Sequence, residues 1–249
     1  MEPRAKTERT VNRTCSTLRA KHPVAMRITI HASSIMLLCL ILYSTEFFAQ
    51  TQRNGPGKDA ILWSPPKMGW PDQLPRPTVP KEMIGSLRVA NMPIILEETT
   101  LEGVQKRLGG TLGSRGDAGE AEAWLCFCGS DSEGPWIFWL TSGELDGPAI
   151  SGFQWRSLSP GERPDRRCRQ LSLGSGRIEL PLAIHLRMTE METRRILGIP
   201  TIVRGKLLIF SHEHKQVIRG ETYSVSNDIA VALRDGVVWA IEVAKSTSN

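Results

Sequence analysis

The sequence predicts an α+β protein made of two tandem repeats, each a short helix packed on an antiparallel β-meander. Three features of the 249-residue chain support this prediction. Two segments with helix start and stop signals begin at Thr100 and Thr189, 89 residues apart. Short runs rich in β-branched and aromatic residues follow each segment, as is typical of strands. Asp235-Gly236, between two apolar runs, is a strong signal for a two-residue hairpin.

Residues 1–49 are predicted to be a signal peptide or an N-terminal anchor. Arg19, Lys21 and Arg27 precede a short apolar run, and the small residue Ala49 stands where a signal would be cleaved. Met26 is an alternative start that gives a more compact leader. The apolar run is shorter than the roughly 20 residues that span a bilayer, which favours cleavage. We therefore expect a periplasmic or secreted protein, in contact with a membrane only if the leader is retained.

Most of the net positive charge of the chain lies in this leader. The whole sequence has 31 Lys and Arg against 26 Asp and Glu, a net charge of +5. Residues 1–49 hold seven of the basic and three of the acidic residues, which leaves 24 against 23 in the rest. A nearly neutral surface has no broad cationic field for phosphates, so the composition argues against nucleic-acid binding.

Residues 50–83 are rich in proline and glycine and are predicted to be an extended linker, because proline removes backbone donors and disfavours helix in the residue before it. Its apolar residues, which include Trp63 and Trp70, can dock on the body or on a partner; a flexible tether is the alternative. The predicted units that follow are 84–158 for the first repeat, 159–177 for a polar, turn-rich connector and 178–245 for the second repeat.

The second predicted helix has the clearer signals. Thr189 is placed to cap its N-terminus, and Glu192, three residues later, can complete a capping box. Gly198 supplies the left-handed residue that ends a helix, and Pro200 prevents continuation. The segment is therefore interpreted as architecture rather than chemistry.

The first predicted helix begins after Thr100 and ends at Gly109. Leu101, Val104 and Leu108 lie on one stripe, so this helix is expected to bury one face. It lacks a capping box because Gly103 stands where the second helix has a glutamate, and we expect it to be the weaker of the two. The strand runs that follow the helices are EAWLCFC, PWIFWLT and AISGFQWRSL after the first, and KLLIFSHEH, ETYSVS, DIAVAL and VVWAIEV after the second.

Three cysteines, Cys126, Cys128 and Cys168, remain after the leader and are predicted to form a structural disulfide in an oxidising compartment. Residues two apart on a strand share a face, so Cys126 and Cys128 can both compete for Cys168. Closing a loop of about 40 residues stabilises a fold by roughly 4 kcal/mol. The alternative, a metal or redox site at the C-x-C pair, has no second pair of ligands nearby.

The second unit resembles the module of small outer-membrane lipoproteins of the SmpA/OmlA (BamE-type) class. The resemblance rests on Met188-Thr189, on Leu197-Gly198 with Pro200, and on Asp235-Gly236. The first unit shows only Thr100 and Leu108-Gly109 of these motifs, and the tandem arrangement is similar to the β-lactamase-inhibitor-protein fold. The resemblance implies an envelope or secreted protein that binds other proteins through sheet and loop surfaces, without catalysis.

The four tryptophans in the strand runs of the first unit are the candidate binding residues. Trp136 and Trp139 have opposite parity, so both faces of one strand carry indole rings. An exposed cluster of them would be a partner-binding surface, and the alternative is a seam between the two units. The residues concerned are Trp124, Trp136, Trp139 and Trp155.

No catalytic, metal or cofactor motif emerges from the sequence. His212 and His214 share a strand face with Glu213 between them, but zinc needs a third and usually a fourth ligand. No serine lies in a nucleophile-elbow motif with a signature histidine. The sequence therefore predicts an exported, non-enzymatic protein-binding module with no cofactor. The alternative is an envelope hydrolase or a metal-dependent enzyme that uses His212, His214 or a serine.

Overall fold

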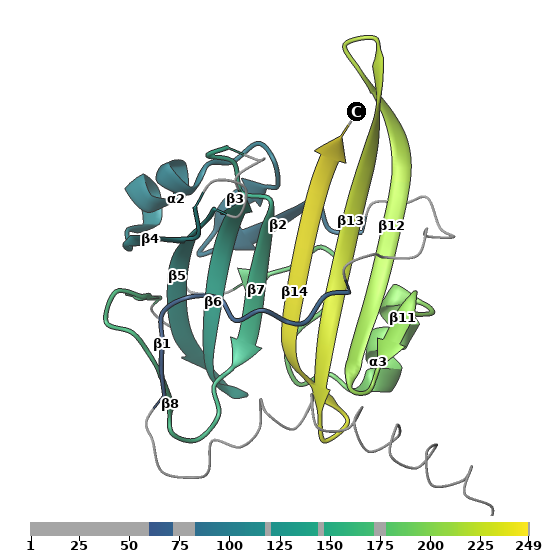
Figure 1. The fold of residues 1–249 in the computed structure, drawn as a ribbon. Helices are drawn as coiled ribbons and strands as arrows, with labels where there is room; N and C mark the ends of the chain where they lie inside the picture. Colours follow the sequence, from purple (N-terminus) through teal and green to yellow (C-terminus); the bar gives the residue numbers. More distant parts are fainter. Residues whose placement is uncertain (1–59, 72–82, 118–120, 144–146, 172–177, 249) are drawn as a thin grey trace, which may run out of the picture. The chain divides into compact units, whose positions relative to one another are not determined.

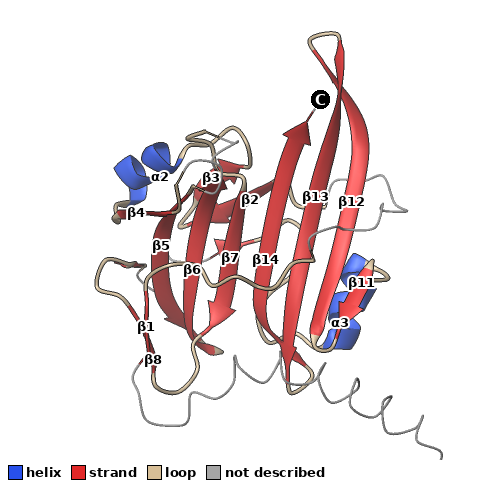
Figure 2. Ribbon diagram, viewed as in Figure 1, coloured by secondary structure: helices blue, strands red, loops and turns tan. Residues whose placement is uncertain are grey.

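One large β-sheet dominates the computed structural model, which describes residues 60–71, 83–117, 121–143, 147–171 and 178–248 (Figures 1 and 2). All of these residues belong to the unit Pro56–Asn249. The predicted leader and most of the predicted linker lie outside the described residues. In spatial order the sheet consists of β11 (Ile202–Arg204), β12 (Leu207–Ile218), β13 (Glu221–Arg234), β14 (Val237–Ser248), β7 (Gly152–Ser157), β6 (Gly134–Gly143), β5 (Glu122–Asp131) and β4 (Leu112–Arg115).

Further strands come from segments that connect or flank these eight. β9 (Arg169–Gln170) is the ninth strand of the large sheet and pairs parallel with β5, whereas the other eight pair antiparallel. A separate three-stranded sheet and a parallel two-stranded pair complete the fold. Their strands are β2 (Ser86–Val89), β3 (Met92–Ile95) and β10 (Ile178–Glu179) in the first, and β1 (Ala60–Leu62) with β8 (Glu162–Pro164) in the second.

The predicted fold class is wrong. The described chain is mostly β, and its two helices, α2 (Leu101–Leu108) and α3 (Glu190–Leu197), have only eight residues each. Instead of two separate helix-on-meander repeats there is one continuous sheet, because β7 pairs with β14 from Gly152–Ala244 to Arg156–Ala240. This pairing satisfies the backbone groups that two separate meanders would leave exposed at their edges. Strand periodicity does not reveal such long-range pairing.

Local signals at the turns were more reliable than the fold class. Asp235 and Gly236 both have positive φ, 54° and 78°, as the tight hairpin between β13 and β14 requires, so that prediction is confirmed. Arg219 and Gly220 form the same kind of turn between β12 and β13.

Both helix predictions are confirmed at the level of their caps. Thr189 and Glu192 form the complete capping box, and Gly198 ends the helix with φ 85°. Thr100 accepts one hydrogen bond from the Gly103 backbone N–H at 3.1 Å, without the reciprocal bond. In α2, Leu101 and Val104 are buried, as the apolar stripe predicted.

The large sheet has apolar residues on both faces. On one face, which we call the core face, Phe127, Phe138 and Phe153 pack with the three-stranded sheet and with both helices in the main hydrophobic cluster. On the other face, two smaller clusters lie beneath residues 60–71, a segment that we call the strap. In Figure 1 the strap is the blue segment after β1 that crosses in front of the strands, so we call this side the strap face.

Candidate functional site

The four candidate tryptophans do not form one exposed platform. Their exposed fractions are 2% for Trp124, 4% for Trp136, 0% for Trp139 and 6% for Trp155. Trp136 and Trp155 belong to the main cluster on the core face, whereas Trp124 and Trp139 belong to a cluster on the strap face. The predicted opposite parity of Trp136 and Trp139 is thus confirmed, and the strand register divides the rings into two pairs.

A glycine lies directly across the ladder from one ring of each pair. Gly113 of β4 is opposite Trp124, and Gly129 of β5 is opposite Trp136. A Cβ atom at Gly113 would lie 2.3 Å from Trp124 Cε2, and one at Gly129 would lie 2.4 Å from Trp136 Cζ2. The absence of a side chain therefore lets each ring lie flat over the neighbouring strand, which fixes its position on its face.

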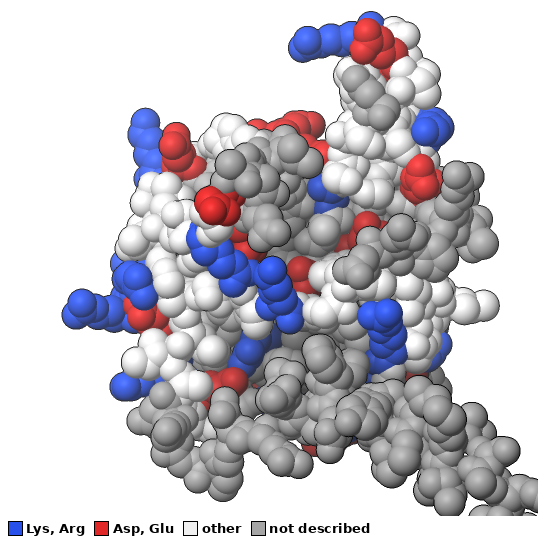
Figure 3. Space-filling view, viewed as in Figure 1, with Lys and Arg blue, Asp and Glu red and all other residues white. Residues whose placement is uncertain are grey.

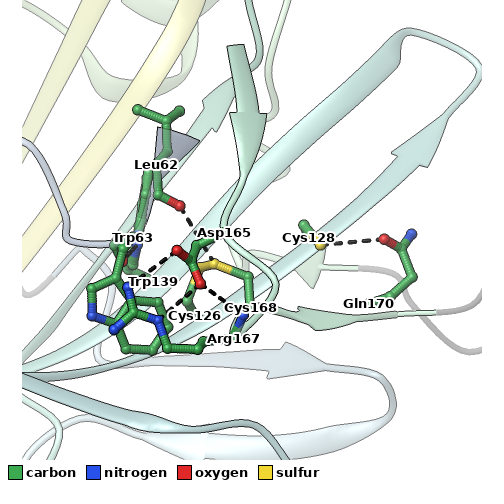
Figure 4. Close-up of a disulfide and its surroundings, with 9 residues drawn as sticks. All are labelled: Leu62, Trp63, Cys126, Cys128, Trp139, Asp165, Arg167, Cys168 and Gln170. Atoms are coloured by element: carbon green, nitrogen blue, oxygen red, sulfur yellow. Dashed lines mark hydrogen bonds and ion pairs between the residues drawn. A yellow bond between two sulfur atoms is a disulfide. The ribbon is translucent and has the colours of Figure 1, made fainter. Parts of the chain in front are cut away.

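The disulfide joins Cys126 to Cys168 on the strap face (Figure 4). The parallel pairing of β5 with β9 sets this choice: Cys128 lies opposite Gln170, and its thiol contacts Gln170 Oε1 at 3.2 Å, while Cys168 precedes β9 next to Cys126. The predicted competition between Cys126 and Cys128 is thus resolved in favour of Cys126. Burial raises the pKa of the Cys128 thiol, so Cys128 remains a protonated core residue and a poor nucleophile.

The strap follows one row of residues across the strands of the large sheet. Register pairs connect Cys126 to Trp139, Trp139 to Gln154, and Gln154 to Glu242. Trp139 Nε1 donates to the Trp63 carbonyl oxygen at 2.9 Å, and Gln154 Nε2 donates to the Pro66 carbonyl oxygen at 2.7 Å. Buried side-chain donors on the sheet thus bind the strap backbone, and this part of the predicted linker docks on the body.

The far end of the strap covers a carboxyl group. Met68 and Trp70 pack on Leu207, Ile209 and Ala230, beside Glu242. Burial raises the pKa of Glu242 to about 7, although hydrogen bonds with the side chains of Trp70 and Gln154 act in the opposite direction.

Arginine side chains cover indole rings on the strap face. Arg167 lies 4.1 Å from the centre of the Trp63 ring, and its guanidinium also binds the Asp165 carboxylate at 2.8 Å. Figure 4 shows these three groups side by side, next to the disulfide. On the face drawn in Figure 3, Lys and Arg side chains gather over the half of the sheet that contains β5 to β7. The other arginine–indole contacts are Arg115 over Trp124 and both Arg156 and Arg234 over Trp239.

The core face contains a pocket of about 670 Å³, which lies above the other pair of tryptophans. This volume is within the range of about 300–1,000 Å³ that is typical of ligand sites. Trp136 and Trp155 form its aromatic part, and the Trp155 indole nitrogen is buried without a hydrogen-bond partner. Its other lining residues are Ser130, Asp131, Ser132, Glu133, Leu171, Ile178, Glu179, Leu180, Ala183, Ile184, His185 and Leu186.

The wall of this pocket, residues 178–186, is anchored to the body at both ends. β10 pairs with β2, and after the wall the Arg187 backbone N–H donates to the Val238 carbonyl oxygen at 2.6 Å. Ala183 within the wall has φ 53°, a conformation that non-glycine residues rarely adopt. The two anchored ends hold the wall in place beside the tryptophans.

Sequence reasoning missed the wall, although its signal is present. Apolar residues occupy every even-numbered position from Ile178 to Met188. All of them are buried except Leu182, which is half-buried. Such alternation indicates a segment with one buried face. The predicted second repeat begins at residue 178, so the segment is assigned to the start of that repeat and its alternation is not recognised as a pocket wall.

The residues of the alternative enzyme hypothesis lie elsewhere on the sheet. His212 and His214 share one face of β12, as predicted, while Glu213 points to the other face, where it binds the Ser224 hydroxyl. Among the described residues, no group of three or more His, Cys, Asp and Glu side chains is placed to hold a metal ion.

The described part of the chain contains no helix that is long and apolar enough to cross a membrane. Comparison of the chain with protein-family models, with curated proteins and with solved structures found no match in any of the three.

Proposed function

We propose that this chain is an exported, non-enzymatic protein of the cell envelope that binds a protein partner at the core-face pocket. The single observation that carries the proposal is the pocket itself, an apolar and aromatic cavity of about 670 Å³ with an acidic edge. Ligand sites in proteins are typically concave and mostly apolar, with a few polar groups that fix orientation. The pocket on the core face has this composition.

The disulfide supports the exported location. Disulfides such as Cys126–Cys168 persist in oxidising compartments and are rare in reducing ones. The predicted signal segment in residues 1–49 agrees with export. The resemblance of the Thr189 and Asp235-Gly236 motifs to the SmpA/OmlA class favours the same compartment and a binding role.

Site-specific photo-crosslinking in living cells tests this proposal. A photo-reactive phenylalanine analogue at Ser132, an exposed residue at the pocket edge, is expected to give a discrete protein adduct. The same analogue at Thr222, exposed at the far hairpin of β12 and β13, is the matched control and should not give that adduct. Ser130→Trp, which fills the pocket from an exposed position, should abolish the adduct.

Two results would contradict the proposal. One is an adduct at Ser132 that is equally strong at Thr222 or insensitive to Ser130→Trp. The other is recovery of the full chain from the cytoplasm with Cys126 and Cys168 reduced, which would remove the argument for export.

A further inference from the structure

We propose that the core-face pocket selects a cationic side chain, arginine or lysine, of the bound protein. The aliphatic stem of that side chain packs against Trp136 and Trp155, and its charge lies beside Asp131 and Glu133. This inference rests on the proposed function, because it assigns the ligand class of the same pocket.

The charge of the lining is the first argument. Three carboxylates, from Asp131, Glu133 and Glu179, line the pocket, and no Lys or Arg among the described residues does. Glu179 has a partner, since Arg88 lies 4.0 Å away. Asp131 and Glu133 form no ion pair with any Lys or Arg in the described part of the chain, and both are exposed.

The geometry of the two acidic residues is the second argument. They lie at the turn between β5 and β6, and Asp131 Oδ1 accepts the Glu133 backbone N–H at 2.9 Å. This bond fixes the orientation of the exposed Asp131 carboxylate at the pocket edge. Arg187 lines a smaller recess next to the pocket, together with Asp131, Glu133 and Trp136. It forms no ion pair with either carboxylate within the described part of the chain.

The strap face of the same protein provides the third argument. There Arg167 lies over the Trp63 ring at 4.1 Å and is held by the Asp165 carboxylate at 2.8 Å. An indole face and a carboxylate together attract a guanidinium through its charge, its planar shape and its hydrogen-bond donors. The pocket also has indole rings and carboxylates in its lining, and none of its described lining residues is an arginine or a lysine.

These contacts define an order of preference among side chains. An arginine or lysine gains from both the aromatic and the acidic part of the pocket, and its stem covers apolar surface while its charged end stays near water. An uncharged side chain of similar length gains only the apolar contact. A glutamate at the same place is repelled by Asp131 and Glu133.

Three peptides of identical frame measure this order: Ac-Leu-Arg-Leu-NH2, Ac-Leu-Met-Leu-NH2 and Ac-Leu-Glu-Leu-NH2. Each is titrated into the full mature chain, and affinity is read from tryptophan indole NMR signals. We expect the arginine peptide to bind about tenfold more tightly than the methionine peptide, from a cation–π contact and two exposed charge contacts of ordinary strength. The glutamate peptide should bind least.

Variants at the acidic turn separate charge from shape. Asp131→Asn together with Glu133→Gln should weaken the arginine peptide about fivefold and leave the methionine peptide unchanged, because only the charge contacts are lost. Glu102→Gln together with Glu221→Gln removes two exposed charges away from the pocket and is the matched control. Both pairs of residues are exposed, so neither double variant threatens the core.

The outcomes distinguish this inference from the function on which it rests. Equal affinity for the arginine and methionine peptides, or an unchanged arginine affinity in Asp131→Asn with Glu133→Gln, would overturn the cation selectivity and leave a binding pocket for apolar groups. Absence of binding by all three peptides would overturn the peptide-binding pocket itself. Binding that Ser130→Trp does not reduce would place the peptide elsewhere and overturn both.

Discussion

The two pairs of tryptophans differ in what covers them. Trp124 and Trp139 lie beneath the strap, where Trp63 makes an edge contact with Trp124 at 5.9 Å and accepts the Trp139 hydrogen bond. Trp136 and Trp155 have similar burial, but the segment facing them leaves a cavity of about 670 Å³. Rings of one residue type on neighbouring strands therefore have different surroundings. The covering segment, rather than the ring, decides which role each pair has.

The charges around the two pairs also differ. On the strap face, arginines already lie over Trp63, Trp124 and Trp239. Around the pocket, the titratable side chains among the described lining residues are three carboxyl groups and one histidine. The indole rings of the strap face thus have cationic partners within the chain, whereas our proposal is that the carboxylates at the pocket edge bind a cation from another molecule.

Removal of the disulfide is expected to have the largest effect on this comparison. Cys126→Ala with Cys168→Ala should lower the free energy of unfolding by about 4 kcal/mol, because it frees a closed loop with a sequence separation of 42. Urea unfolding monitored by circular dichroism measures the loss. Cys128→Ala, the control, removes only a buried thiol, at about 1 kcal/mol. An equal loss from the control would contradict the observed pairing.

Alanine at the two cross-strand glycines should disturb one face each. Gly113→Ala and Gly129→Ala should each cost about 1–3 kcal/mol, because the new methyl group displaces the ring of Trp124 or Trp136. Near-ultraviolet circular dichroism reports the ring displacement. Only Gly129→Ala should also weaken peptide binding at the pocket. A binding loss confined to Gly113→Ala would reverse the assignment of the two faces.

The strap should make stability depend on pH through Glu242. Its pKa is raised from 4.5 to about 7 in the folded protein, so the native state keeps a proton that the unfolded chain releases. The contribution of Glu242 to stability is therefore complete below about pH 4.5, falls as the pH rises to about 7 and then levels, with a total loss of about 3 kcal/mol. Denaturant unfolding at several pH values measures this slope.

Glu242→Gln is the matching variant for that slope. Glutamine stays neutral and keeps the contacts with Trp70 and Gln154, so the loss between pH 4.5 and 7 should shrink. Asp228, whose pKa burial also raises, remains and accounts for a residual slope of the same sign. An unchanged slope in the variant would show that Glu242 does not titrate beneath the strap.

The smallest expected effect concerns the arginine over the strap. Arg167→Gln should lower the free energy of unfolding only slightly, because Arg167 is half-exposed and both the indole contact and the bond to Asp165 are screened by water. Arg166→Gln, at the exposed neighbouring position, should change stability by less. Equal effects of the two variants would mean that the contact with Trp63 contributes nothing specific.

Local features of the fold could be predicted from the sequence, and its global pairing could not. The caps at Thr100 and Thr189 and the turn at Asp235-Gly236 depend on a few adjacent residues, so their signals survive without tertiary information. The pairing of β7 with β14 joins residues 84 to 92 positions apart and has no such local sequence signal. The predicted tandem repeats failed at this pairing.

The candidate site could be predicted only in part, for a similar reason. Parity placed Trp136 and Trp139 on opposite faces, and it also placed Cys126 and Cys128 on one face. Which face would be covered depended on the strap and on the wall at residues 178–186, whose positions are fixed by contacts distant in sequence. The parallel register of β9 then decided between Cys126 and Cys128.

The most direct test of the comparison is to see which indole signals respond when Ac-Leu-Arg-Leu-NH2 is titrated into the 15N-labelled protein. Assignment uses single Trp→Phe variants. The account predicts that the indole N–H signals of Trp136 and Trp155 shift with the peptide, while those of Trp124 and Trp139 stay in place beneath the strap. Shifts at Trp124 and Trp139 with none at Trp136 and Trp155 would contradict it.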